Sequence, residues 1–115
     1  MVKREHELKR DTVSGLMGGE GELSRIHFME PDEFHGRGRL FCRFTIKEGD
    51  SIGYHKHEGE QEGYYILKGK ALLNDNGTET TLNSGDFALC VPDQSHSIKN
   101  IGDTDLEFIA LILSV

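Results

Sequence analysis

Cysteine and proline are scarce in this chain, and long apolar runs are absent. Cys42 and Cys90 are the only thiols among 115 residues, each lies within an apolar run, and their spacing matches no zinc or redox motif. We therefore expect both to be buried, reduced thiols of a cytoplasmic protein, with a single disulfide between them as the alternative. With only two prolines, the turns must be made mainly by glycine, aspartate and asparagine.

No apolar stretch is long enough to span a membrane, since the longest, residues 106–115, is interrupted by Glu107. The first eleven residues are rich in charge and carry no apolar segment of the kind found in signal peptides. Acidic residues outnumber basic ones by 20 to 13, which gives a formal net charge of −7, and the basic residues are scattered. Because nucleic-acid surfaces need clustered Lys and Arg, we expect neither nucleic acid nor a membrane as a partner.

Charge and glycine set residues 1–20 apart from the rest of the chain. Charged residues dominate as far as Asp11, and a glycine-rich segment over residues 15–19 then interrupts regular structure. We expect an N-terminal arm over residues 1–20, which could be exchanged between the subunits of a dimer. Residues 21–115 should form one domain, because a chain of this length has room for a single core.

Alternation of side-chain types predicts short β-strands in that domain. The clearest example is the segment 39–47, in which the even-numbered residues from Leu40 to Ile46 are apolar. Asn76 and Gly77 predict a hairpin turn, because this pair adopts positive φ at low cost. About nine strands are expected, over residues 22–30, 39–47, around His55 and His57, 62–68, 70–74, 78–82, 87–91, 95–100 and 106–113. Without a long helix, this pattern is typical of an all-β sandwich or barrel.

One short stretch concentrates metal-binding side chains. His55 and His57 are two residues apart, so on a strand both point to the same face, and Glu62 and His96 follow. Neutral imidazole binds first-row transition metals, and one carboxylate adds charge and affinity for oxygen-seeking ions. We expect His55, His57, Glu62 and His96 to hold one divalent metal (Mn, Fe, Ni or Zn), with Glu60 as the competing carboxylate. The remaining histidines, which we expect on the surface or satisfied within the core, are His6, His27 and His35.

The two segments that carry these residues resemble the two motifs of the cupin superfamily. The first motif, G-x5-H-x-H-x(3,4)-E-x6-G, is matched by residues 49–69 at every spacing. The second, G-x5-P-x-G-x2-H-x3-N, resembles residues 85–100, with Val91 in place of the proline and Asp93 in place of the glycine. Since Asp tolerates left-handed geometry better than most residues, we expect that turn to be kept. The resemblance implies a single-domain double-stranded β-helix, or jelly-roll barrel, with a metal ion in its mouth.

The resemblance also implies a range of functions. Small cupins that look like this chain include oxalate-decarboxylase-like lyases, dioxygenases, and sugar isomerases or epimerases. We expect a metal-dependent enzyme acting on a small carboxylate or hydroxylated molecule, with a non-catalytic ligand-binding or sensor module as the alternative. Glu60 and Tyr64 are the candidate catalytic residues, by proximity alone, and Tyr64 shares the inward parity of Glu62. Arg43 could clamp a substrate carboxylate if its face of the strand is the cavity, although a solvent or interface face is favoured.

The outward strand faces predict self-association. Tyr65 and Leu67 alternate with the inward residues of their strand, and the C-terminal segment 106–115 is largely apolar. Together these side chains exceed what one small barrel can bury. We therefore expect a homodimer that binds a small-molecule ligand.

Overall fold

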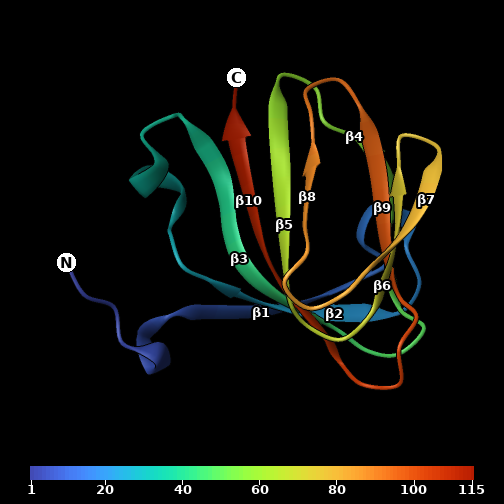
Figure 1. The fold of residues 1–115 in the computed structure, drawn as a ribbon. Helices are drawn as coiled ribbons and strands as arrows, with labels where there is room; N and C mark the ends of the chain where they lie inside the picture. The colour runs from blue at the N-terminus through green and yellow to red at the C-terminus, as the bar shows by residue number, and fades with distance from the viewer.

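Two antiparallel sheets face each other in the computed structural model, which describes residues 1–115 (Figure 1). The larger sheet has six strands in the order β1-β2-β3-β10-β5-β8, and the smaller has four in the order β4-β9-β6-β7. The strands are β1 (Lys9–Ser14), β2 (Glu22–His27), β3 (Gly38–Ile46), β4 (Ser51–Lys56), β5 (Glu60–Lys68), β6 (Ala71–Asp75), β7 (Thr78–Leu82), β8 (Phe87–Cys90), β9 (Ser95–Asn100) and β10 (Leu106–Ser114). The all-β jelly-roll prediction is confirmed.

Three short 3-10 helices complete the fold, and none has the length and apolar character that a membrane span requires. They are η1 (Glu5–Glu7), η2 (Leu16–Gly18) and η3 (Pro31–Phe34).

The turns predicted from the sequence are present as well. Asn76 and Gly77 have φ of 52° and 100° in the β6–β7 hairpin, and Asp93 has φ of 67°. Aspartate therefore keeps the left-handed turn for which the second motif uses glycine.

The N-terminal segment contains a strand that the sequence pattern did not indicate. Strand β1 pairs antiparallel with β2 along its whole length. Alternation failed to reveal it because five of its six residues are charged or small and polar, with Val13 as the exception. Helix η2 then packs closely against β4, since a Cβ at Gly53 would lie 2.0 Å from the backbone oxygen of Met17. Glycine is thus required at position 53 for this approach.

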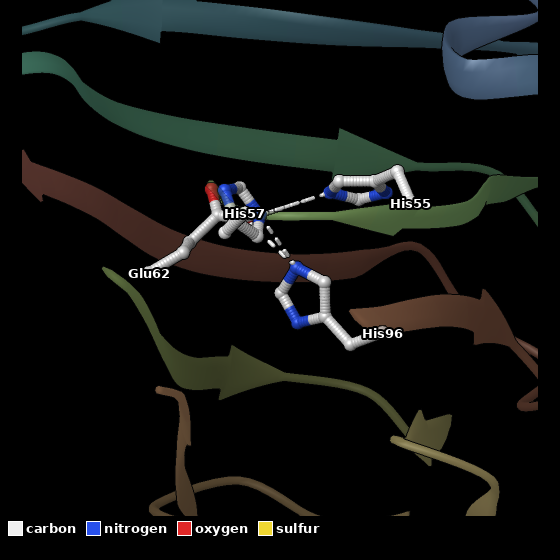
Figure 2. A group of neighbouring side chains, drawn as sticks. All are labelled: His55, His57, Glu62 and His96. Carbon is white, nitrogen blue, oxygen red and sulfur yellow. Dashed lines mark hydrogen bonds and ion pairs between the residues drawn. The ribbon is translucent and has the colours of Figure 1, made fainter. Parts of the chain in front are cut away.

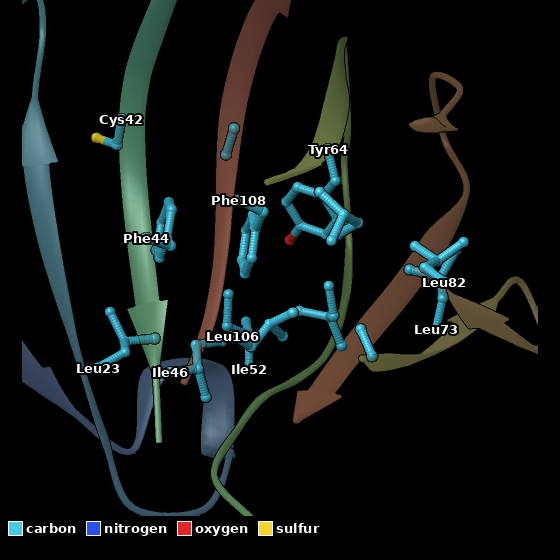
Figure 3. Packing of buried hydrophobic residues seen from close by; sticks show 14 residues of the cluster. Leu23, Cys42, Phe44, Ile46, Ile52, Tyr64, Leu73, Leu82, Leu106 and Phe108 are labelled. Atoms are coloured by element: carbon cyan, nitrogen blue, oxygen red, sulfur yellow. The ribbon is translucent and has the colours of Figure 1, made fainter. Parts of the chain in front are cut away.

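The core fills the space between the two sheets (Figure 3). The Phe44 and Phe108 rings stack with their centroids 5.1 Å apart, and the Tyr64 ring lies 4.8 Å from that of Phe108. On β5, Glu62 and Tyr64 are buried whereas Tyr65 is 44% exposed, so the predicted parity of that strand is confirmed.

Both cysteines are buried, and no disulfide joins them. Burial raises the pKa of the Cys42 thiol and of the Cys90 thiol to about 11 in each case. Each therefore remains a neutral thiol near pH 7, in which state cysteine is a poor nucleophile.

Arg43 faces away from the barrel interior. Its Nη2 atom lies 3.1 Å from a carboxylate oxygen of Glu107 on the neighbouring strand β10, and its side chain is 41% exposed. The alternative of a solvent or interface face is therefore correct, and Arg43 does not line the cavity described below. Arg39 does line that cavity, although Arg39 and Arg43 are four residues apart on β3 and would point to the same face of a regular strand. The register between β3 and β10 shifts by one residue beside Arg39, and such a bulge breaks the alternation of side chains.

Candidate metal centre

Three histidines and one glutamate converge between the two sheets (Figure 2). His55 lies on β4 opposite His96 of β9, and His57 follows one residue after β4 ends. Glu62 approaches from β5 of the other sheet. One potential ligand atom from each of the four residues lies within 4.8 Å of the others. The fold thus brings together all four side chains that the sequence singled out.

The separations between these atoms fit a small divalent ion. The His57 Nε2 atom lies 3.0 Å from the Nε2 atoms of both His55 and His96. The Glu62 Oε1 atom lies 3.0 Å from His57 Nε2, 3.0 Å from His96 Nε2 and 3.9 Å from His55 Nε2. Two ligand atoms at right angles, each about 2.1 Å from an ion, are about 3.0 Å apart. The four residues could therefore hold one ion.

Hydrogen bonds from the Nδ1 atoms of His55 and His57 orient the lone pairs of the Nε2 atoms of these rings toward the centre of the cluster. His55 Nδ1 lies 2.7 Å from the Gly53 carbonyl oxygen, which can only accept, so Nδ1 donates. His57 Nδ1 lies 2.9 Å from a carboxylate oxygen of Glu60 and donates in the same way. In neutral rings both Nε2 atoms are then acceptors, and they face the carboxylate of Glu62. Convergent acceptors need a cation between them, which is the chemistry of a metal site.

Glu60 lies behind His57 and not among the convergent atoms. Arg39 holds the Glu60 carboxylate with two hydrogen bonds, from Nε at 2.8 Å and from Nη2 at 2.7 Å. These bonds lower the pKa of Glu60 to about 2, so the carboxylate is ionised near pH 7. A carboxylate that accepts from the non-ligating nitrogen of a histidine fixes its ring orientation, as is common around metal centres.

The protonation states of the centre follow from its burial and its contacts. Burial opposes ionisation of Glu62, but the contacts of its carboxylate with the imidazoles of His55, His57 and His96, when those rings are protonated, outweigh it and hold the pKa of Glu62 well below its ordinary value. The hydrogen bond with Glu62 raises the pKa of His57, whereas burial lowers the pKa of His96. An ionised carboxylate is therefore available near pH 7, and a bound metal would compete with a proton for the Nε2 atom of His57.

Tyr64 completes the surroundings of His96. The two rings stack with centroids 4.9 Å apart and an interplanar angle of 9°, and the Tyr64 hydroxyl oxygen lies 3.5 Å from His96 Nε2. Burial raises the pKa of Tyr64 well above its ordinary value. Its hydroxyl therefore stays protonated and can donate a hydrogen bond toward the centre.

Known proteins are similar to this chain in both sequence and fold. The family model described as "Cupin domain" matches residues 42–112. The chain belongs to the cupin family. An oxalate-binding protein from Thermotoga maritima is 42% identical over 113 residues, which cover 98% of this cupin and 93% of that protein.

Solved structures agree with this assignment. The crystal structure of a predicted oxalate decarboxylase from Thermotoga maritima superposes with a TM-score of 0.94 at 42% identity, and the match covers 100% of both chains. An uncharacterised protein with a double-stranded β-helix domain from Klebsiella pneumoniae gives a TM-score of 0.68 at 24% identity, over 78% of this cupin and 75% of that chain. The second likeness supports the fold alone.

A small cavity of about 70 Å³ adjoins the candidate metal centre of this cupin. Besides His55, His57, Glu62 and Tyr64, its walls include side chains that the sequence analysis did not select for this role. Arg25 and Arg39 contribute charge, while Leu16 and Met17 come from the N-terminal segment. The parity that places Leu23 inward also applies to Arg25 two residues later, so this signal was available in the sequence.

Arg25 belongs to a second polar cluster, which consists of Asp11, Arg25, His27 and Cys42 on neighbouring strands β1, β2 and β3. Arg25 donates to Asp11 from Nε at 2.8 Å and from Nη2 at 2.7 Å. His27 Nε2 lies 3.1 Å from a carboxylate oxygen of Asp11, and His27 Nδ1 lies 3.1 Å from Cys42 Sγ. His27 is thus satisfied within the barrel, as expected, and the two other non-cluster histidines are exposed.

The fold should draw pH-dependent stability from Asp11. The hydrogen bond from Arg25 lowers the pKa of Asp11 from 3.8 to about 2. Since the folded pKa lies below the unfolded one, the contribution is complete above pH 4 and is lost as the pH falls through about 2. We expect Asp11→Asn to lower the free energy of unfolding by about 1 kcal/mol at pH 7, after allowance for solvent screening, and by much less at pH 2.5.

Urea unfolding at the two pH values measures this difference. Asp103→Asn is the matched control, because Asp103 is exposed and forms no ion pair in the structure. A loss for Asp11→Asn that is equal at both pH values would contradict the expectation, since it would come from altered packing and not from charge.

Proposed function

We propose that this cupin holds one divalent transition metal at His55, His57, Glu62 and His96 and uses it to bind a small carboxylate of the oxalate class. The observation that carries the proposal is the convergence of four ligand atoms within 4.8 Å. Three imidazoles and one carboxylate suit Mn, Fe, Ni or Zn, and they leave two positions on a six-coordinate ion, which one carboxylate group of the ligand can occupy. The related protein from Thermotoga maritima that is named for oxalate binding supports the ligand class.

The size of the cavity favours a small ligand. Its volume of about 70 Å³ corresponds to about two water molecules, each of which occupies roughly 30 Å³ in the liquid. A ligand of a few non-hydrogen atoms, such as oxalate, suits this space better than a sugar phosphate does. We therefore prefer a small carboxylate to the substrates of sugar isomerases.

The residues around the centre have separate roles in this proposal. A bound divalent ion would supply a Lewis acid that polarises a carboxylate oxygen of the ligand. Glu60 acts as a positioning residue, because it holds the ring of His57, and Arg39 keeps Glu60 ionised. Tyr64 keeps its proton and donates a hydrogen bond to a ligand oxygen at the centre.

A second candidate function is decarboxylation of the same ligand, and the buried hydroxyl of Tyr64 favours it. Cleavage of the carbon–carbon bond of oxalate releases carbon dioxide and leaves an electron pair on the remaining carboxylate carbon. One proton added to that carbon gives formate, so the reaction needs a held proton but no oxidant. Tyr64 is a neutral donor close to the ligand atoms, with its hydroxyl oxygen 3.5 Å from His96 Nε2.

Elemental analysis of protein purified without added metal or chelator is the first test. We expect about one Mn, Fe, Ni or Zn per chain, and calorimetric titration should show oxalate binding to the loaded protein but not to the chelator-treated protein. Formate released from oxalate by the loaded protein would establish the lyase, whereas binding without product would establish a ligand-binding module. Absence of metal, with no gain in melting temperature on metal titration, would overturn the proposal.

We also propose that two copies associate through the outer face of the six-stranded sheet. A groove of about 280 Å³ runs over β3, β10, β5 and β8 and is lined mainly by apolar side chains. Tyr65, Phe87 and Leu89 are 44%, 62% and 42% exposed there. Contiguous apolar surface of this kind is typical of interfaces.

Two further aspects of the proposal concern the environment of the protein. The free thiols of Cys42 and Cys90 support a cytoplasmic location, because reducing compartments keep cysteines unpaired. The net charge of −7 supports the proposal that nucleic acid is not a partner. The expected partners are thus a small-molecule ligand and a second copy of the chain.

A further inference from the structure

We propose that Arg25 is a second anchor for the ligand, which binds the carboxylate group not held at the metal centre. The proposal rests on metal-centred binding of a carboxylate, as argued above, and adds a selectivity to it. Ligands with two adjacent anionic or acceptor groups, such as dicarboxylates and 2-oxo acids, would contact both anchors. Monocarboxylates would contact only one of them.

The location of Arg25 is the first argument. Arg25 lines the same cavity as His55, His57 and Glu62, and its side chain is only 19% exposed. The cavity has one other arginine, Arg39, whose side chain is 54% exposed. Arg25 is therefore the more enclosed cation of the two, and a hydrogen bond from it to an anion is less weakened by water.

The free edge of the guanidinium is the second argument. The group has five N–H donors, arranged so that it can hold carboxylates along two edges. Asp11 occupies the edge formed by Nε and Nη2, whereas Nη1 makes no hydrogen bond in the structure. The edge formed by Nη1 and Nη2 thus remains available for a second carboxylate. A lysine could not serve both edges, because its ammonium group is a single point of charge.

Rigid support of Arg25 is the third argument, and it gives the second polar cluster a role. Asp11 fixes Arg25 with two hydrogen bonds, His27 contacts Asp11, and Cys42 contacts His27. An arginine that is already held in place loses little conformational freedom when a ligand binds. The half-buried cluster therefore acts as a support that keeps the free edge in position.

The test compares oxalate with acetate on metal-loaded protein by calorimetry. We expect Arg25→Gln and Arg25→Lys each to weaken oxalate binding by about 10- to 100-fold, the range for loss of a charged hydrogen bond. Acetate binding should change by less than about 3-fold in both variants. Arg43→Gln is the matched control and should leave both affinities unchanged, because Arg43 pairs with Glu107 outside the cavity.

Asp11→Asn is the second variant and keeps the proposal falsifiable if the Arg25 variants do not fold. It leaves Arg25 in place but weakens its support, so the ratio of oxalate to acetate affinity should fall by about 3- to 10-fold. If the wild-type protein binds metal and oxalate but this ratio of affinities stays constant in every folded variant, only the proposal that Arg25 is an anchor is overturned, and the proposed function stands. If the wild-type protein binds no metal or no oxalate, the proposed function itself fails.

Discussion

Replacement of His57 by alanine is expected to abolish measurable metal binding. The Nε2 atom of His57 lies 3.0 Å from a ligand atom of each of the three other residues, so it is central to the set. Removal of an outer partner of a metal ligand alone costs about 10- to 100-fold in affinity, and loss of the ligand itself should exceed about 100-fold. Metal titration monitored by melting temperature measures the effect, because binding to the folded state alone stabilises it.

Two companion variants separate loss of a ligand from general damage. His6→Ala removes an exposed histidine of η1 and should leave metal binding unchanged. Glu60→Gln keeps all four ligand residues and alters the carboxylate that pairs with both His57 Nδ1 and Arg39, so its loss of metal affinity should be intermediate, about 10-fold. If His57→Ala still binds one ion per chain with the affinity of the wild type, the four residues do not form the site.

The cluster of His55, His57, Glu62 and His96 could be predicted from the sequence because its geometry depends on local rules. Residues two apart share one face of a strand, which relates His55 to His57 and Glu62 to Tyr64. The side chains lie on or directly beside strands β4, β5 and β9, and the predicted bounds of β9 are those observed. Only the approach of Glu62 on one sheet to the histidines on the other depends on the overall fold. The spacing of the cupin motifs predicted this approach.

Apart from Arg25, whose inward parity follows from that of Leu23, the cavity walls could not be predicted in the same way. Alternation identifies a strand through apolar inward residues, but β1 carries Asp11, whose charge is offset by Arg25 of β2. That pairing joins residues 14 positions apart and follows from the register of two strands. The bulge beside Arg39 likewise depends on the partner strand β10. Ion pairs and bulges of this kind are properties of the folded sheet and leave no periodic signal in the sequence.

Introduction of lysine at Phe87 and Leu89 together should convert the proposed homodimer into a monomer. Both side chains project from the outer face of β8, and Phe87 lies opposite Tyr65 of β5. An interface centred on this face would bury the two ammonium groups without partners, which costs several kcal/mol. Light scattering at micromolar concentration should give twice the chain mass of 12.9 kDa for the wild type and a single chain mass for the variant.

The location of the substitutions, and not added charge as such, should decide this outcome. Tyr54→Lys tests the distinction, because Tyr54 is 51% exposed on β4 of the smaller sheet, outside the groove. It should leave the dimer intact. Since the groove and the metal centre involve different side chains, the monomeric variant should still bind one ion, with an affinity close to that of the wild type. A monomeric wild type would refute the dimer, and loss of metal binding in the monomer would mean that association also shapes the metal centre.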